Sequence, residues 1–291
     1  MRYVHSLWTK PMMQNRRDVR TKKQIITTLW CSASSVAYLK KLNQHIILFA
    51  DKFAKDMLSY LPYEKIYPLN IPNNTPTYLW AQGKFFALKD MQLGDIHIDS
   101  DVFIKTQKLT DIIKYGVEHS DLIIQSIEDE DHTRNDFYQN CFDFAKICDI
   151  NFLYGADNKH KPAYNCGLVG FNSDELKYKY LSNYMNILEQ LTDNKQAEKL
   201  ANKTKCWPDL LFEQKNLFDI AKDYKIFNLL GTGKEAYKNA LRYGYQHILG
   251  DGKWNQLYDI KLQLKNLNED IYYQTQETID YILDTLNTKE Q

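Results

Sequence analysis

The sequence predicts an α/β fold, in which a mostly parallel central sheet is flanked by helices and followed by a C-terminal helical extension. Short apolar runs alternate with helical patterns along most of the 291 residues, which is typical of strand–helix–strand units. From Trp254 onward the apolar residues keep a helical spacing as far as Ile282. We therefore expect one domain over residues 1–255 and a C-terminal helix over residues 256–291.

The elements can be assigned in order from these patterns. Strands are expected at residues 3–7, 45–50, 65–69, 95–98, 121–125, 225–230 and 244–249. Helices are expected over about 25–42, 51–61, 78–91, 137–147, 174–192 and 209–223, with a short one between the last two strands. The segment YNCGLVGF, from Tyr164 to Phe171, is interpreted as turn-like, and the acidic loop at 127–136 as a solvated connection.

Charge and composition exclude some classes of protein. The 37 basic residues are balanced by 37 acidic ones, so no overall positive field is available to hold a nucleic acid. The first residues mix apolar and polar side chains, so they predict neither a signal peptide nor an integral membrane segment. We therefore expect a cytoplasmic protein. Its five cysteines form no C-x-x-C pair and are expected to be buried reduced thiols.

Two carboxylates stand where an apolar strand ends, in the segment GDIHIDSDVFI. Asp99 and Asp101 alternate in an extended segment, so both side chains can point to one side. Two close carboxylates repel unless a cation lies between them, and hard oxygen ligands suit magnesium or manganese. The alternative is an acidic turn after a strand, because D-x-D also occurs by chance.

A second group of polar residues follows the last expected strand, in the segment YGYQHILGDGKWN. His247 ends this strand and is followed by Gly250, Lys253 and Trp254. The glycine lets the backbone turn sharply, the imidazole can bind a metal, and the lysine can pair with a phosphate. A lone histidine beside a strand is usually only a satisfied polar group, but the joint arrangement is much less common by chance.

Together the two motifs resemble those of a known family. H-x-x-G-x-x-K followed by Trp resembles the H-x-x-G-x-x-K-P-W element of the glycogenin and lipopolysaccharide galactosyltransferase family, whose other hallmark is a strand-end D-x-D. The resemblance implies a GT-A, or Rossmann-like, nucleotide-sugar-binding catalytic domain over residues 1–255. It also implies that Asp99, Asp101 and His247 bind Mn2+ or Mg2+. Gly250 and Lys253 would then lie against the diphosphate of the donor.

Weaker resemblances lie between these motifs. Lys84, in WAQGKFFAL, is similar in place to a basic residue that contacts the donor in that family. Asn165 and Gly167 resemble its N-x-G segment near the sugar and acceptor, and Glu213 with Gln214 resembles its catalytic pair beside the reacting sugar. Each also has an ordinary interpretation, as an exposed helix lysine, a turn asparagine and a polar pair on a helix surface.

The resemblance predicts a metal-dependent hexosyltransferase that uses a UDP-sugar and a glycan or other hydroxyl acceptor. The expected proline between Lys253 and Trp254 is absent, and Glu213 stands where the family has Asp. The donor sugar and the retaining or inverting outcome therefore stay open. The N-terminal part, with HS-x-W-x-K-P and W-A-x-G-K, also resembles bacterial proteins of glycosyltransferase-like type that have no assigned substrate.

Other classes of function remain as alternatives. A non-catalytic nucleotide-sugar-binding module would use the same metal site. A haloacid-dehalogenase-type phosphatase would use the first aspartate as a nucleophile, but it favours Thr or Val where Phe103 stands. The C-terminal helix could pack on the domain, pair two subunits as a homodimer or rest on a membrane. The membrane alternative is the least favoured, because the polar side of this helix has no basic excess.

Overall fold

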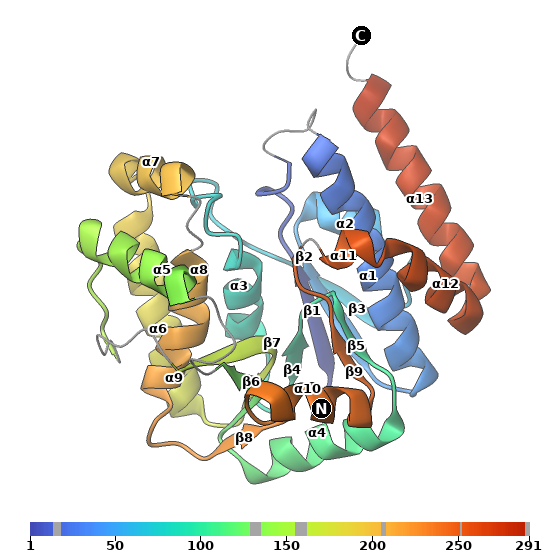
Figure 1. Cartoon of the computed structure of the whole chain (residues 1–291). Coiled ribbons are helices and arrows are strands. Elements are labelled where there is room, and N and C mark those ends of the chain that lie inside the picture. The colour runs from blue at the N-terminus through green and yellow to red at the C-terminus, as the bar shows by residue number, and fades with distance from the viewer. Residues whose placement is uncertain (14–18, 129–134, 155–161, 205–207, 251, 289–291) are drawn as a thin grey trace.

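A seven-stranded sheet runs through the centre of the molecule, in the order β3-β2-β1-β4-β7-β6-β8 (Figure 1). The structure is a computed structural model that describes residues 1–13, 19–128, 135–154, 162–204, 208–250 and 252–288. The strands of the central sheet are β1 (Tyr3–Leu7), β2 (Ile46–Ala50), β3 (Lys65–Pro68), β4 (Ile96–Ile98), β6 (Leu122–Glu128), β7 (Ala163–Phe171) and β8 (Ile226–Asn228). A second, two-stranded sheet pairs β5 (Val102–Ile104) with β9 (Tyr245–His247).

The central sheet is mostly parallel, as predicted. Strands β3, β2, β1 and β4 run parallel to one another, and β8 is parallel to β6. Only β7 runs against its neighbours, β4 and β6. The carboxyl ends of the parallel strands therefore meet at one edge, where ligands bind in sheets of this kind.

Helices cover both faces of the sheet (Figure 1). One apolar core lies against α3 (Gln82–Asp90), α5 (Asn135–Ile147), α6 (Asp174–Leu191), α7 (Lys195–Thr204), the π-helix η1 (Leu211–Lys215) and α9 (Asn216–Ile220). The three-residue α8 (Pro208–Leu210) directly precedes η1. The other core lies against α1 (Val19–Lys41), α2 (Lys52–Leu58), α4 (Gln107–His119), α10 (Gly233–Tyr243), α12 (Leu257–Leu267) and α13 (Glu269–Thr288). The short α11 (Gly252–Asn255) follows β9. Helices α4 and α7 were not anticipated from the sequence.

The segment YNCGLVGF is a strand, so its interpretation as a turn was wrong. Every residue of β7 is buried, and the strand pairs with β4 on one side and β6 on the other. Its glycines suggested a turn, yet they serve close packing: a Cβ on Gly170 would lie 2.4 Å from the Cδ1 of Ile96.

The C-terminal region is two helices instead of the single helix predicted. The backbone turns at Asn268, whose φ of −157° is extended, and the Ile271 N–H donates to the Asn268 side chain at 3.0 Å. Asn268 thus ends α12 and caps α13. Ile260, Leu264 and Ile271 are buried in the core that contains α1, so the chain itself covers this apolar side. Among the described residues, no helix is both long and apolar enough to cross a bilayer.

Two expectations concern residues outside the described part. Residues 129–134 of the acidic loop are not described, so its interpretation as a solvated connection stays a prediction. Cys206 is likewise outside the described residues. Cys31, Cys141 and Cys166 are buried and Cys148 is half-buried, so the predicted burial of the thiols is largely confirmed.

Candidate metal centre

The two carboxylates of the D-x-D segment lie on a tight turn that leads from the large sheet into the small one. Val102 N–H donates to the Asp99 carbonyl at 2.9 Å, which closes the turn between β4 and β5. Strand β5 then pairs antiparallel with β9, so Val102 stands opposite His247. This pairing brings the histidine, distant in sequence, to the aspartates.

Asp99, Asp101 and His247 form a compact group of potential metal ligands. One ligand atom from each lies within 4.8 Å of the others. The Nε2 of His247 is 3.4 Å from Oδ1 of Asp101, and this buried oxygen makes no hydrogen bond to any residue that the structure describes. Two carboxylates, one of which has a buried oxygen without a hydrogen bond, and one imidazole fit a divalent cation of the Mg2+ or Mn2+ type.

Two lysines neutralise the carboxylates. Lys253 Nζ lies 2.5 Å from Oδ2 of Asp101, and Lys84 Nζ lies 2.8 Å from Oδ1 of Asp99. Burial disfavours the Asp101 carboxylate, but the interactions with His247 and Lys253 outweigh burial and hold the pKa of Asp101 below its usual range. Asp101 therefore stays ionised at neutral pH and is ready to accept a cation.

Lys84 is a buried lysine that contacts three acceptors, whereas the ordinary interpretation of the sequence was an exposed helix lysine. It is only 6% exposed, and its ammonium group also donates to the Glu213 carboxylate at 2.5 Å and to the Cys166 carbonyl at 2.9 Å. Burial disfavours its charge, but Asp99 and Glu213 outweigh burial and raise the pKa of Lys84. All three acceptors belong to the chain itself, so Lys84 positions Asp99 and Glu213.

Four further predicted site residues lie on two elements beside this group: Asn165 and Gly167 on β7, and Glu213 and Gln214 on η1. Gly167 accepts the Asp99 N–H at its carbonyl, at 2.9 Å. The Asn165 amide, on the same strand, donates to Glu128 at 2.9 Å and accepts the Gly167 N–H at 3.0 Å. Glu213 and the half-buried Gln214 lie on η1, a π-helix of the kind that occurs often at functional sites. The structure therefore brings together residues from five segments of the chain: α3, the turn between β4 and β5, β7, η1, and β9 with the turn after it.

Gly250 stands apart from the cluster, on the turn after β9. Its φ is +53°, and a Cβ there would meet no atom of the described residues within 4 Å. Glycine suits this position because the backbone has a positive φ, and not because a neighbouring atom leaves no room for a side chain. The turn carries the chain from His247 to Lys253, so both side chains reach Asp101.

Gln125 and Tyr245 were missed by sequence reasoning. The Tyr245 hydroxyl and the His247 Nδ1 lie 2.6 and 2.9 Å from the same amide oxygen of Gln125. The only sequence signal was a polar residue at the end of the apolar run DLIIQ. That signal does not show which side chain the amide contacts.

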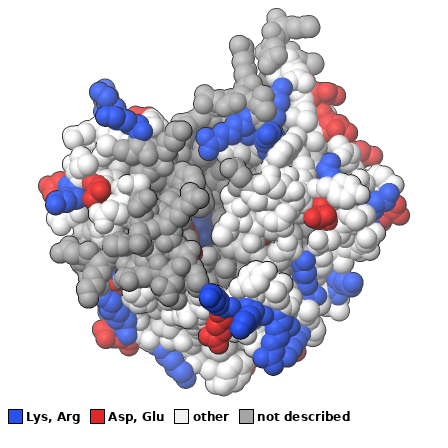
Figure 2. Space-filling view, in the orientation of Figure 1, with Lys and Arg blue, Asp and Glu red and all other residues white. Residues whose placement is uncertain are grey.

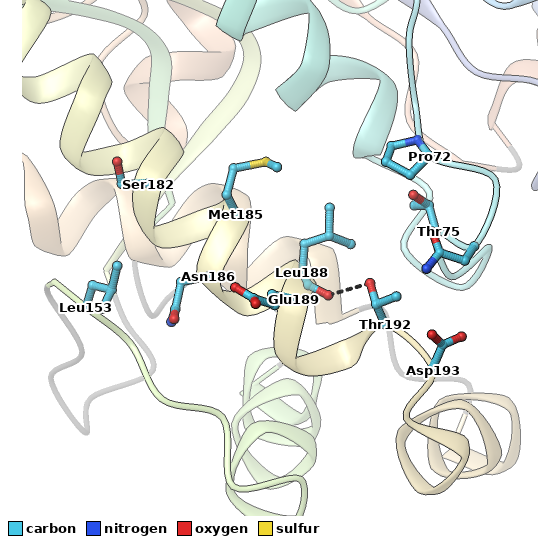
Figure 3. A pocket seen from close by; sticks show the side chains of 11 residues that line it. Pro72, Thr75, Leu153, Ser182, Met185, Asn186, Leu188, Glu189, Thr192 and Asp193 are labelled. Atoms are coloured by element: carbon cyan, nitrogen blue, oxygen red, sulfur yellow. Dashed lines mark hydrogen bonds between the residues drawn. The ribbon is translucent and has the colours of Figure 1, made fainter.

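The surface above the sheet edge is hollowed between the two groups of helices, and Lys or Arg atoms are visible inside the hollow (Figure 2). A separate groove of about 780 Å3 lies between the loop after β3 and α6 (Figure 3). It is lined by Pro72, Asn74, Thr75, Leu153, Ser182, Met185, Asn186, Leu188, Glu189, Thr192 and Asp193. None of these residues belongs to the carboxylate–imidazole cluster, so this groove is separate from the candidate metal centre.

Asp209 anchors the segment that carries Lys84. Its buried carboxyl group accepts the Ala81 N–H at 2.8 Å, just before α3, and lies 3.3 Å from the Tyr184 hydroxyl. Burial raises the pKa of Asp209 to about 8, although the hydrogen bond from Ala81 opposes the shift. The folded protein therefore keeps a proton on Asp209 at pH values where the unfolded chain has lost it.

This proton makes stability depend on pH. The contribution of Asp209 is fully present below the unfolded pKa of about 4 and is lost as the pH rises through about 8. We expect Asp209→Asn to gain stability relative to wild type by up to ~1.4 kcal/mol per pH unit across this window. Urea unfolding of both proteins at several pH values measures this difference. A constant difference would contradict the assignment.

The structure is thus that of an α/β protein with a carboxylate–imidazole cluster that could hold a cation at the carboxyl edge of its sheet. The chain belongs to the family described as "Family of unknown function (DUF6734)", whose model matches residues 1–277. No curated protein matches the chain. Among solved structures it is similar to 4-diphosphocytidyl-2C-methyl-D-erythritol synthase from Anaerococcus prevotii DSM 20548, with 9% identity and a TM-score of 0.33. That match covers 83% of this chain and 94% of the other.

Proposed function

We propose that this protein is a divalent-metal-dependent glycosyltransferase of the GT-A type, which takes a hexose from a nucleotide-diphosphate donor. The observation that carries the proposal is the convergence of the D-x-D aspartates with His247 and Lys253 on one site. These residues come from two motifs that stand far apart in the sequence, and the β5–β9 pairing joins them. UDP is the expected nucleotide, and a glycan or other hydroxyl compound is the expected acceptor in the cytoplasm.

The charges of the cluster would stabilise a leaving diphosphate. Asp99, Asp101 and His247 would hold Mn2+ or Mg2+, which supplies positive charge to a leaving diphosphate when it is bound. Lys253 is about a third exposed and reaches the cluster from the turn after β9, so its ammonium can donate to a phosphate oxygen. Lys84 lies deeper and fixes the orientation of Asp99.

Glu213 and Gln214 would border the reacting sugar. Burial raises the pKa of Glu213, although Lys84 opposes the shift by attracting the ionised form. The carboxyl group is held at 2.5 Å by Lys84, so its position relative to Asp99 is fixed. No covalent protein nucleophile is required, because electrostatic stabilisation of the leaving group accounts for bond breaking.

Turnover separates a transferase from a binding module. Glycosyltransferases often hydrolyse the donor slowly when no acceptor is present, whereas a binding module leaves it intact. A panel of nucleotide sugars is incubated with the full chain and manganese, and release of UDP or GDP is measured. Binding of a donor without any hydrolysis or transfer would favour the non-catalytic alternative.

His247 and Lys253 are expected to differ in how they bind the nucleotide. His247→Ala should weaken UDP or GDP binding when manganese is present and change little with a chelator, because the imidazole acts through the metal. Lys253→Ala should lose ~1.5–3 kcal/mol of charge-assisted hydrogen bonding under both conditions. Isothermal titration of both variants and wild type separates the two behaviours. If His247→Ala matches wild type in manganese, the metal-site assignment fails.

A further inference from the structure

Gln125 lies opposite an irregular stretch of the neighbouring strand. The pairing steps from Ile124 opposite Val169 to Ser126 opposite Asn165, so residues 166–168 of β7 bulge against Gln125 alone. Bulges re-aim side chains and occur often beside active sites. The Gln125 side chain is 93% buried, since its exposed fraction is 7%, and its amide oxygen lies against β9.

The amide oxygen of Gln125 faces two polar side chains of β9. It lies 2.9 Å from the Nδ1 of His247 and 2.6 Å from the hydroxyl oxygen of Tyr245. Gly167 makes room for this arrangement, because a Cβ there would lie 2.4 Å from both the amide oxygen and the Cε1 of His247. Any larger residue at position 167 would therefore displace the contact between Gln125 and His247.

We propose that Gln125 is a positioning residue that holds His247 in the tautomer with its proton on Nδ1. A carbonyl oxygen of an amide can only accept, and a neutral imidazole carries one N–H, so the hydrogen bond places that proton on Nδ1. The lone pair of Nε2 then points to the side of Asp101, whose Oδ1 is 3.4 Å away. The consequence for metal binding rests on the proposed function, whereas the tautomer itself does not.

The tautomer can be measured in the metal-free protein. Histidine nitrogens are labelled with 15N, and long-range 1H–15N spectra are recorded at alkaline pH, with His247→Asn identifying the signals of His247. We expect the Nδ1–H form in wild type and in Gln125→Glu, whose carboxylate still accepts. Gln125→Leu should shift His247 toward the Nε2–H form. An Nε2–H form in wild type would overturn the proposal, whatever the protein binds.

Metal affinity gives the second readout. Gln125→Leu should bind Mn2+ ~10–100-fold more weakly than wild type, as is usual when the partner of a metal-binding histidine is lost. Gln125→Glu should bind at least as tightly as wild type, which a merely structural role for the amide would not explain. The matched control is Gln246→Leu, on the residue before His247, whose amide lies 3.3 Å from Gln256 and outside the cluster.

The outcomes distinguish the two proposals. If wild type binds Mn2+ and Gln125→Leu binds it equally well, the positioning role is overturned while the metal site stands. If wild type binds no Mn2+, the proposed function fails and the tautomer measurement alone decides the role of Gln125. If Gln125→Leu does not fold, Gln125→Glu and the wild-type spectrum still decide it.

Discussion

Asp101→Asn and Asp99→Asn are expected to reduce donor hydrolysis by ~10²–10³-fold or more, which is the usual cost of removing a group that stabilises developing charge. Each substitution keeps the shape of the side chain but removes one negative charge from the site that would hold the cation. Hydrolysis of the donor is measured with saturating manganese, beside thermal unfolding of the same samples. The fold should stay cooperative, because each variant loses one ion pair, to Lys84 or Lys253, and keeps the shape of the side chain.

Asp95→Asn is the matched control for these variants. Asp95 begins the same segment but binds Arg2 at 2.6 Å and is not part of the cluster. Its replacement should lower the unfolding temperature and leave hydrolysis unchanged. Hydrolysis at the wild-type rate in both Asp99→Asn and Asp101→Asn would remove the metal site from the mechanism.

The sheet could be predicted where strands alternate with amphipathic helices. The ranges expected for β1, β2, β3 and β4 enclose the observed strands, because each is a short apolar run between helical patterns. Strand β7 was missed because glycine and asparagine are typical of turns, and β7 contains both. In the structure its glycines allow close packing against neighbouring strands. Local sequence carries no information on those neighbours.

The candidate site was predictable to the extent that its chemistry lies in compact motifs. The D-x-D and His247 segments indicated one metal site, and the structure brings their side chains together. The environment of Lys84 was not predictable, because its three acceptors come from β4, β7 and η1 or the turns beside them. The role of Gln125 depends on a bulge and on space left by Gly167, so it also required the three-dimensional structure.

Lys84→Met is expected to destabilise the metal-free protein by about 3–5 kcal/mol, because it leaves the buried Glu213 carboxyl group without its counter-charge. Adding Glu213→Gln should recover part of this loss, since a neutral amide needs no cation. Urea unfolding of wild type, both single variants and the double variant gives the interaction energy of the pair. Lys89→Met, at the exposed end of the same helix, is the control and should change stability by less than ~0.5 kcal/mol.

Manganese should then distinguish a structural from a functional role for this lysine. A cation bound at Asp99 would replace part of the charge that Lys84 supplies there, and binding to the folded state alone adds stability by mass action. We therefore expect the loss in Lys84→Met to be smaller in manganese than in chelator, whereas the Lys89→Met control should show no such difference. A loss below ~1 kcal/mol in chelator would contradict the ion-pair network. An equal loss under both conditions would mean that Lys84 and the cation do not share Asp99.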